Sequence, residues 1–422
     1  MRITIQKVGK IQKADITVEG LTLIAGKNDT GKSSVSKTLY AIIKSINEYT
    51  EVFHSHKTYD IRVNYFLPLL QRYSAIMHKD NPLSREIILT LDVLRERPSW
   101  NAKKITEDKI LSIVKSIKNT KYEELPALII ENIDTILKEL EKIKNTKEED
   151  KLIFGLNNKL RDIFSNNINN SKYHEPASVD VFNQGNKILS FDVDDDKCFK
   201  ASCDFLKIKS LYGKVIYIET PFVLERIFTF GEKPHWREIL SACYNDSNEK
   251  PQMSANTEII DFIQNEIFGQ ATFGLDKENV KYYYQVDKDS SKISLQNSAC
   301  GIKSFALLFS LLKEDNITKD TLLLIDEPEN HLHPEWQIKY AQLICLLIKK
   351  GFSVVINSHS PTFIQALGAF SNKYGISNKS SFYLAEQSKE ANNYSKIEDV
   401  SNNVERIYEN LIVPTEKLFT GV

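Results

Sequence analysis

The sequence predicts an α/β fold in which one long helical stretch interrupts the alternation of strands and helices. Strand-like segments alternate with helix-patterned ones from residue 2 to about residue 357, and a glycine-bounded turn after Gly26 joins a short apolar run to a helix. Residues 49–175 differ, being rich in Lys, Glu, Asn and Ile and largely helical in pattern. We therefore expect one globular head, made from residues 1–48 and 176–422, that a helical insertion over residues 49–175 divides in sequence.

The expected strands are short runs that are alternating or wholly apolar, and turn residues bound them. Residues 183–186 are a good turn between two of them, and Pro221 terminates another. Strands are predicted over residues 2–7, 11–18, 21–25, 178–182, 187–193, 214–219, 282–286, 292–295, 321–325 and 352–357. Helices are predicted after Gly31, over much of 223–268, from residue 302 and over 334–350.

The insertion carries a weak heptad pattern. Ile130, Ile133, Leu137 and Leu140 approximate two heptads with charges between them. A coiled coil needs three or four heptads, so a helical hairpin or a small helical insertion is the better prediction. Basic and acidic residues nearly balance over 101–150, which favours a solvated face or a protein contact over a nucleic-acid groove.

Composition places the chain among soluble globular proteins. Its 422 residues include 55 Lys and Arg against 56 Asp and Glu, so a bulk cationic nucleic-acid binder is not indicated, although a local basic face stays open. The five cysteines show no C-x-x-C spacing, which favours free thiols in a reducing compartment. The first residues lack the apolar stretch of a signal peptide, and no apolar run approaches the roughly 18 residues that span a bilayer. We expect a cytoplasmic protein that is not held in a membrane.

The segment GKNDTGKS at residues 26–33 matches the pattern G-x-x-x-x-G-K-[ST]. Its glycines let backbone N–H groups wrap a phosphate at the N-terminus of the following helix. Lys32 would pair with the β- and γ-phosphates, and the Ser33 hydroxyl would ligate Mg²⁺. The strand before the segment and the helix after it supply the context that this motif needs. The candidate nucleotide ligands are Gly26, Asn28, Asp29, Thr30, Gly31, Lys32, Ser33 and Ser34.

Two further strand ends carry polar side chains suited to a nucleotide. The apolar run 321–325 delivers Asp326, which could hold magnesium through water, and Glu327, which could polarise the attacking water. The run 352–357 precedes His359, which could reach a γ-phosphate from the same sheet. Two acids at a strand end are common and a lone His is more often structural, so the combination with residues 26–33 is what favours a nucleotide site.

The segment QNSACGIK at residues 296–303 is a polar turn that enters a helix. This turn could place a second helix N-terminus near a phosphate. Taken alone, it is an ordinary helix cap.

Together these four segments resemble the ATP-binding-cassette (ABC) ATPases of the RecF/SMC/Rad50 branch. The resemblance is closer to bacterial AAA15-type ATPases, those of the overcoming-lysogenisation-defect (OLD) family and of the Septu and PARIS anti-phage systems. It rests on GKNDTGKS at 26–33, NSACGIKSF at 297–305, LLLIDEPENHLHP at 322–334 and VVINSHSP at 354–361, and it covers the first 50 residues and roughly 210–410. The segment NSACGIKSF, which corresponds to the signature segment of ABC ATPases, departs from the transporter pattern L-S-G-G-Q. The resemblance implies a P-loop NTPase head with a mixed β-sheet core.

The resemblance also implies roles for single residues. Two ATP molecules with Mg²⁺ would be sandwiched between two heads, and Ser298 and Gly301 of one head would cap the γ-phosphate bound by Lys32 of the other. Glu327 would be the catalytic base and His359 the switch histidine, with residues 330–333 at the dimer interface. Ser33 and Asp326 would hold the metal. The Q-loop glutamine is left open, because residues 219–221 occupy its expected region without a Gln.

Our leading hypothesis is a Mg²⁺-dependent ATPase that forms a homodimer or higher homo-oligomer around nucleotide. It would regulate an effector nuclease of HNH or TOPRIM type in trans, in bacterial anti-phage defence. About 60 residues follow His359, too few for the TOPRIM nuclease of OLD-type proteins, and the insertion would be the natural docking surface. The alternative is a RecF-like DNA-repair or DNA-binding ATPase, so direct contact with nucleic acid stays open. A third hypothesis makes ATP a structural ligand only, against which the intact Asp326–Glu327 pair argues.

Other candidate groups are weaker. The acidic run 192–196 could bind a divalent cation but is more typical of a strand end and turn. The pairs His54/His56 and His331/His333 have H-x-H spacing without an obvious third ligand.

Overall fold

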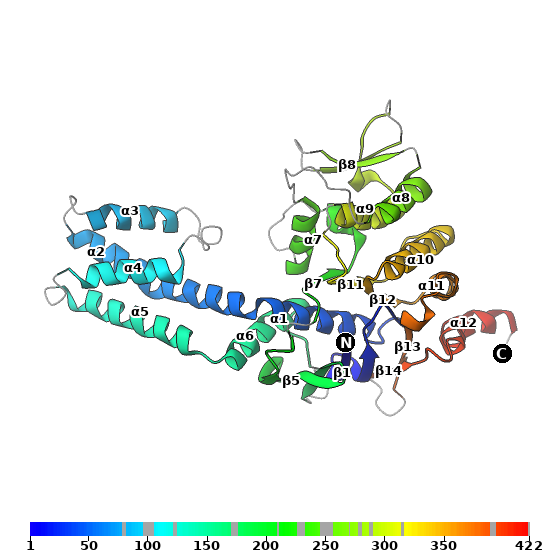
Figure 1. Cartoon of the computed structure of the whole chain (residues 1–422), viewed down its shortest axis with the longest axis horizontal. Coiled ribbons are helices and arrows are strands. Elements are labelled where there is room, and N and C mark those ends of the chain that lie inside the picture. The colour runs from blue at the N-terminus through cyan, green and yellow to red at the C-terminus, as the bar shows by residue number, and fades with distance from the viewer. Residues whose placement is uncertain are drawn as a thin grey trace. The chain divides into compact units, whose positions relative to one another are not determined.

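The chain forms two compact units. The first consists of Met1–Asn47 and Leu156–Val422, and the second of Glu48–Gly155. The computed structural model describes residues 1–77, 82–95, 105–120, 125–169, 176–208, 211–225, 233–244, 256–269, 271–276, 281–286, 290–313, 316–388 and 394–420 (Figure 1).

The second boundary lies earlier than residue 175, where the sequence analysis placed it. Helix α6 (Glu148–Phe164) crosses the division at Gly155, and its second half belongs to the first unit. Asn157 explains why, since its side chain donates to the Cys198 carbonyl at 2.9 Å and accepts from the Cys198 N–H at 2.7 Å. Residues 170–175, at the expected boundary, lie outside the described residues.

The first unit is built on a mixed sheet. In the described residues it has eleven strands in the order β6-β5-β4-β1-β2-β14-β13-β3-β12-β11-β7. Their bounds are β1 Arg2–Val8, β2 Ile11–Thr17, β3 Leu21–Gly26, β4 Ala177–Asn183, β5 Asn186–Asp194, β6 Lys197–Cys203, β7 Lys214–Ile218, β11 Thr321–Asp326, β12 Ser353–Ser358, β13 Ser380–Gln387 and β14 Ser395–Asp399. A smaller sheet contains β8 (Thr272–Asp276), β9 (Lys281–Gln285) and β10 (Ile293–Ser294).

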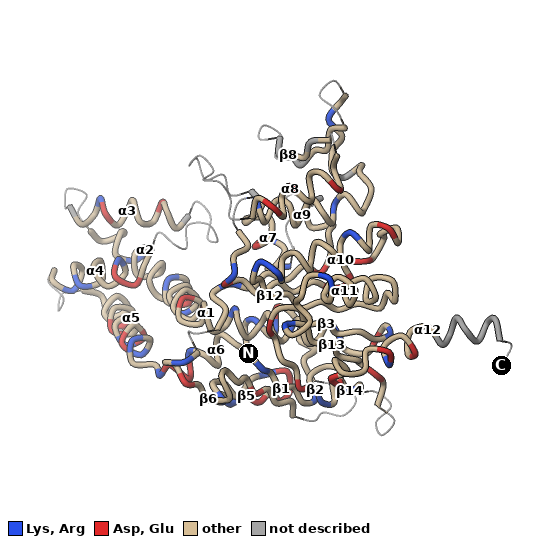
Figure 2. The backbone as a smooth tube through the Cα atoms, turned by 45° about the vertical axis from the view of Figure 1, so that its right-hand side comes forward, with Lys and Arg blue, Asp and Glu red and all other residues tan. Residues whose placement is uncertain are grey.

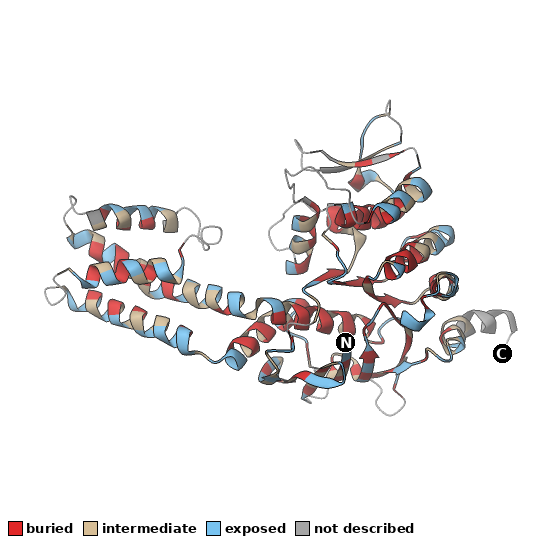
Figure 3. Ribbon diagram, viewed as in Figure 1, coloured by how far each residue is buried: buried red, intermediate tan, exposed pale blue. Residues whose placement is uncertain are grey.

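The large sheet has a parallel half and an antiparallel half. Strands β13, β3, β12, β11 and β7 pair in parallel, whereas β6, β5, β4, β1 and β2 pair antiparallel. Strands β3 and β11 are buried at every position, as expected of parallel strands with both faces covered (Figure 3). This mixed α/β architecture, with its large mixed sheet, confirms the predicted fold class.

Helices bury the faces of the parallel half. The helices of the first unit are the first part of α1 (Lys32–Ile61), α7 (Pro234–Tyr244), α8 (Thr257–Ile263), α9 (Cys300–Lys313), α10 (Pro334–Lys349), α11 (Pro361–Lys373) and α12 (Glu405–Thr420). Within α9 almost every residue is buried, and it shares one core with side chains of α8, α10 and α11. The helical stretch predicted over 223–268 contains α7, α8 and a short π-helix at Gln264–Phe268, and its residues 226–232 and 245–255 lie outside the described part.

The second unit is helical and has its own core. It contains the end of α1, a π-helical turn η1 (Arg62–Phe66), α2 (Leu67–Ile76), α3 (Pro82–Arg95), α4 (Glu107–Lys118), α5 (Ala127–Asn145) and the start of α6. Its buried cluster includes Phe66, Leu70, Ile113, Ile133 and Ile136. Both lysines and acids occur along α4 and α5 (Figure 2).

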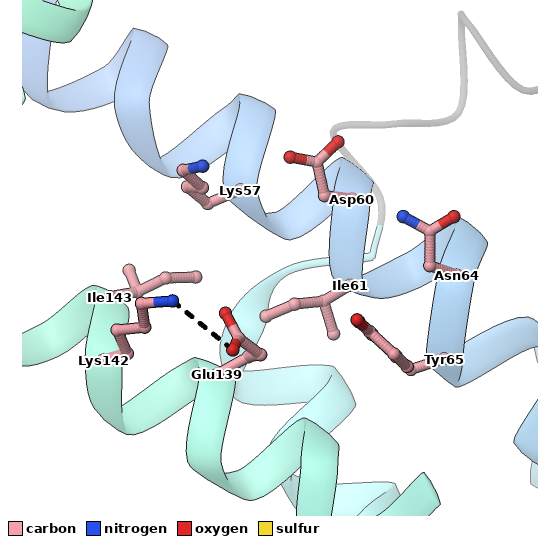
Figure 4. Close-up of a pocket in the computed structure, with 8 residues that line it drawn as sticks. All are labelled: Lys57, Asp60, Ile61, Asn64, Tyr65, Glu139, Lys142 and Ile143. Atoms are coloured by element: carbon pink, nitrogen blue, oxygen red, sulfur yellow. Dashed lines mark ion pairs between the residues drawn. The ribbon is translucent and has the colours of Figure 1, made fainter.

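A cavity of about 490 Å³ lies within this helical unit, between α1–η1 and α5 (Figure 4). Its lining residues are Lys57, Asp60, Ile61, Asn64, Tyr65, Glu139, Lys142 and Ile143. The Lys142 ammonium lies 3.6 Å from the Glu139 carboxylate. The two lysines and two acids balance in charge, and none of the eight residues belongs to the four sequence motifs.

None of the helices in the described ranges combines the length and the apolar character that crossing a membrane would require.

Residue Glu219, directly after β7, ties that strand to the start of α7. Its carboxylate forms an ion pair with Lys233 and lies 3.5 Å from the His235 imidazole Nε2. Burial by itself would raise the pKa of Glu219, but His235 and Lys233 outweigh it and lower the pKa to about 2. The carboxylate is therefore charged throughout the neutral pH range.

Close helix packing in the second unit generates a first prediction. A Cβ added to Gly155 would lie 2.7 Å from Tyr49 Cβ, whereas a Cβ at Gly368, in α11, would meet nothing within 4 Å. We expect Gly155→Ala to lower the free energy of unfolding by about 1–3 kcal/mol through overpacking. Gly368→Ala should raise it by about 0.5–1 kcal/mol, because alanine favours the helix. Urea unfolding of both variants measures this, and equal signs for the two changes would contradict the packing.

The group of Glu219, Lys233 and His235, called the Glu219 cluster below, generates a pH-dependent prediction. Because the pKa in the folded chain lies below the ordinary value of 4.5, the cluster stabilises the fold above pH 4.5 and loses this effect as the pH falls toward 2. Glu219→Gln should cost on the order of 2 kcal/mol at pH 7. The difference from the wild type should shrink by at least half at pH 3. Urea unfolding at the two pH values tests it, and a difference independent of pH would contradict the assignment.

Candidate functional site

The parallel register of three strands assembles the site at one edge of the sheet. Strand β12 lies between β3 and β11, with Ser358 opposite Ala25 and Asn357 opposite Asp326. Because all three strands run in the same direction, their carboxyl ends meet, which is where α/β sheets bind ligands. The loop that begins at Gly26 therefore lies beside the acids after β11 and the histidine after β12.

The loop from β3 to α1 adopts a conformation that its glycines permit. A Cβ at Gly26 would lie 2.5 Å from the Ala385 carbonyl oxygen, and Gly31 has φ 82°. Asp29 also has a positive φ, of 67°, and its exposed carboxylate pairs with Lys10. The Thr30 hydroxyl donates to the Lys27 carbonyl at 2.8 Å. The loop thus curls tightly ahead of the N-terminus of α1, which begins at Lys32.

Lys32 is buried inside this curl. Its ammonium donates to the carbonyls of Gly26 at 2.9 Å and Lys27 at 2.8 Å. Burial lowers the pKa of Lys32, and the charges of Glu327, Glu329 and Asp326 oppose the shift. Lys32 is thus the cation among three carboxylates, of which Asp326 ends β11 and the other two follow it.

Asp326, at the end of β11, is held by hydrogen bonds from three elements. Its carboxylate accepts from the Tyr217 hydroxyl at 2.7 Å and from the Asn357 amide, and Ser33 is a third partner. Burial raises the pKa of Asp326, while the bonds to Tyr217, Ser33 and Asn357 lower it. The structure thus brings together Ser33 and Asp326, the two residues expected to hold a metal.

Glu327 stands at the turn that leaves the sheet. Its φ is 46°, and its N–H donates to the Asn357 carbonyl at 2.8 Å. The carboxylate accepts from the Asn330 amide at 2.7 Å, and its other oxygen lies 3.5 Å from His359 Nδ1. The two residues expected to be catalytic, Glu327 and His359, are therefore neighbours.

Sequence reasoning did not single out Tyr217, Glu329 or Asn357, which the structure places in the site. Glu329 is buried and accepts from the Ser358 hydroxyl at 2.7 Å and the His359 N–H at 2.9 Å. Asn357 joins Asp326 to Ser36 of α1, whose hydroxyl lies 2.8 Å from the Asn357 amide nitrogen. The available signal was polarity: each is a polar side chain at the end of an otherwise apolar strand or just after one.

Several buried polar atoms of the site have no hydrogen-bond partner among the described residues. They are Glu329 Oε2, Asn357 Oδ1 and His359 Nδ1. Buried polar atoms are normally satisfied, so unpaired ones beside Lys32 and Asp326 fit a polar ligand that supplies the missing partners. A magnesium ion takes one or two carboxylates together with phosphate oxygens, which Asp326 and the Ser33 hydroxyl suit. The residues present therefore fit a magnesium–nucleotide complex.

The signature segment is packed differently from the loop. The Ser298 N–H donates to the Leu295 carbonyl at 3.1 Å just before α9. Gly301 is buried, and a Cβ there would lie 2.5 Å from the Trp336 ring. No hydrogen bond or ion pair in the described part of the chain joins Ser298 or Gly301 to residues 26–34.

The strand end in the Q-loop region carries the Glu219 cluster. Ile218 lies opposite Ile325, so Glu219 follows β7 at the level of Asp326. Its carboxylate faces Lys233 and His235, and it is Tyr217, two residues earlier, that contacts Asp326.

The weaker candidates for metal binding have structural partners. His54 lies 2.7 Å from Glu107, His56 packs edge-on to Phe154, and Asp196 accepts from the N–H groups of Ile168 and Asn169. Over the described ranges no group of three or more His, Cys, Asp or Glu side chains could hold a metal.

Comparisons with known proteins place the chain in a family. The model of the AAA ATPase domain (AAA_15) matches residues 1–364. None of the curated proteins matches. Among solved structures, an SMC head domain from Thermotoga maritima is 10% identical with a TM-score of 0.40, covering 94% of this chain and 98% of that one. An SMC head bound to the C-terminal winged-helix domain of ScpA is 12% identical with a TM-score of 0.45, covering 94% and 97%.

A third structure, an Smc head domain with an extended coiled coil bound to the C-terminal domain of ScpA, derives from Pyrococcus furiosus. It is 10% identical with a TM-score of 0.35, covering 97% of this chain and 98% of that one. The family match, by contrast, spans residues 1–364 and so contains all four motifs, the last of which ends at residue 361. The chain belongs to the AAA ATPase domain family.

Proposed function

We propose that the chain binds ATP with Mg²⁺ and hydrolyses the ATP, and that two copies close around the nucleotide. The observation that carries the proposal is the meeting of the loop 26–34 with Asp326, Glu327 and His359 at the carboxyl ends of β3, β11 and β12. Phosphate, metal and water each have a chemically suitable partner at that edge.

The residues take different roles in hydrolysis. Lys32 would exchange the two carbonyls that now hold it for oxygens of the β- and γ-phosphates. Magnesium, held by Ser33 and Asp326, would neutralise charge on the phosphates. Glu327 would accept a proton from water as the water oxygen bonds to the γ-phosphorus and the bond from that phosphorus to the ADP oxygen breaks. His359, beside Glu327, would contact the γ-phosphate.

The second copy would complete the site. In the described part of the chain, Ser298 and Gly301 form no hydrogen bond or ion pair with residues 26–34, which suits residues that cap the γ-phosphate on a partner head. Residues 330–333, which follow Glu327, would lie at the interface. The resulting assembly would be a homodimer, or a higher homo-oligomer, that nucleotide bridges.

The client of this ATPase is proposed to be an effector nuclease of HNH or TOPRIM type, in cytoplasmic anti-phage defence. This part rests on the resemblance of the four motifs to those of the Septu and PARIS systems. The helical unit supports it with large apolar side chains that are more than 39% exposed, namely Tyr59, Val63, Ile76, Ile88, Leu89 and Leu128. These side chains are the candidate contacts for a protein partner.

The catalytic proposal is tested with Glu327→Gln. The amide cannot accept a proton, so phosphate release should fall about 100-fold or more while ATP binding persists. The variant should accumulate as a nucleotide-bridged oligomer in light scattering. Lys32→Ala should lose ATP binding, and Glu258→Gln, on an exposed surface beside Lys350, should behave as wild type. Hydrolysis by Glu327→Gln at the wild-type rate would show that the catalytic assignment is wrong.

The partner proposal is tested with an HNH or TOPRIM nuclease, if a neighbouring gene encodes one. We expect that nuclease to bind the full chain and its cleavage rate to depend on ATP. Leu89→Asp, at a side chain 67% exposed in the helical unit, should weaken binding about tenfold. Leu206→Asp, at a side chain 91% exposed in the first unit, is the matched control. ATPase activity stimulated by duplex DNA, with steep salt dependence and no effect of the nuclease, would favour the RecF-like alternative instead.

A further inference from the structure

We infer that Glu329 is a positioning residue for ATP hydrolysis: its buried carboxylate fixes the segment Ser358–Ser360 and thereby places His359 against Glu327. The inference rests on the proposed ATPase function and adds a residue to it. Glu329 is 4% exposed and belongs to the turn between β11 and α10.

One oxygen of Glu329 receives three hydrogen bonds from consecutive residues. Its Oε1 accepts from the Ser358 hydroxyl at 2.7 Å, the His359 N–H at 2.9 Å and the Ser360 N–H at 3.2 Å. These donors span the step from the end of β12 to the N-cap of α11, where Ser360 also caps the helix by accepting from the Phe363 N–H. A carboxylate that gathers several N–H groups fixes a backbone segment firmly, since bonds to an ionised acceptor are the strong ones.

The histidine between those bonds is placed symmetrically. His359 Nδ1 lies 3.5 Å from Glu327 Oε1 and 3.5 Å from Glu329 Oε1. Glu327 is itself fixed by the bond from its N–H to the Asn357 carbonyl and by the Asn330 amide. Residues 326–330 and 357–360 are thus joined by several hydrogen bonds. Among the described bonds, those from the N–H groups of residues 359 and 360 to residues 326–330 all end on Glu329.

A purely structural role would not need the charge. The second oxygen, Oε2, is buried and has no partner among the described residues, and a buried carboxylate oxygen left unpaired is costly. The Glu329 charge also acts on Lys32, opposing the fall of its pKa that burial causes. The hydrogen bonds of the carboxylate, however, go to residues 358–360, so its main effect is on the segment that carries the histidine.

Steady-state phosphate release by the full chain tests this, with Glu329→Gln and Glu329→Asp as variants. Glutamine keeps the shape and one acceptor oxygen but loses the charge, and aspartate keeps the charge but is too short to reach all three donors. Both should lower kcat by about 10- to 100-fold, the range expected for a misplacement of about 1 Å. The KM for ATP should stay within about threefold, because residues 26–34 are untouched. Glu258→Gln is the exposed control.

The outcomes separate the two proposals. Wild-type activity no higher than that of Lys32→Ala would overturn the ATPase proposal and this inference with it. Clear wild-type activity with kcat unchanged in both Glu329 variants would overturn this inference alone. A parallel loss of kcat, ATP affinity and melting temperature in both variants would assign Glu329 a merely structural role, and would also overturn it. Unchanged melting and ATP affinity with a reduced kcat is the result that we expect.

Discussion

The parallel pairing of β3, β12 and β11 is the constraint on which the site depends. Its register sets Ser358 beside Ala25 and Asp326 beside Asn357, so the residue that follows each strand is delivered to one edge. A slip of one residue would turn every side chain of a strand to the opposite face. Because β3 and β11 are buried at all positions, such a slip would not be resisted by an apolar–polar alternation. The polar contacts at the strand ends then favour the observed register over a shifted one.

Those polar contacts form a network that locks the register. The Asn357 amide contacts Asp326 on the neighbouring strand and Ser36 on α1, so one side chain links β12, β11 and the helix after the phosphate loop. Tyr217 adds β7 through its bond of 2.7 Å to Asp326. Buried polar groups rarely raise stability over an apolar core, but a shifted register would leave them unpaired at a cost in free energy. At this edge the selected arrangement is also the one that groups the candidate site residues.

The sequence predicted correctly those strands whose pattern can be recognised within a short stretch of residues. The apolar runs 21–25, 321–325 and 352–357 coincide closely with β3, β11 and β12, because continuous burial leaves a plain pattern. Strand β13, the other neighbour of β3, went unpredicted: only Phe382–Ala385 of its SSFYLAEQ sequence is buried, and polar residues on both sides hide the run. The residues of the loop 26–34 and the acids Asp326 and Glu327 could also be identified from the sequence. Tyr217 and Glu329 were not, since their importance lies in which distant atom each touches.

The balance of charge at this edge bears on how a nucleotide is admitted under the proposed function. Lys32 faces the charges of Asp326, Glu327 and Glu329, so acids outnumber the buried cation. A bare triphosphate would add further negative charge to a setting where burial has removed the screening of water. An ATP that arrives with its magnesium brings the compensating cation, and Asp326 and Ser33 already stand together to receive it. Under the proposed function, these acids would disfavour the nucleotide alone and would favour its metal complex, so they would contribute to the choice of substrate.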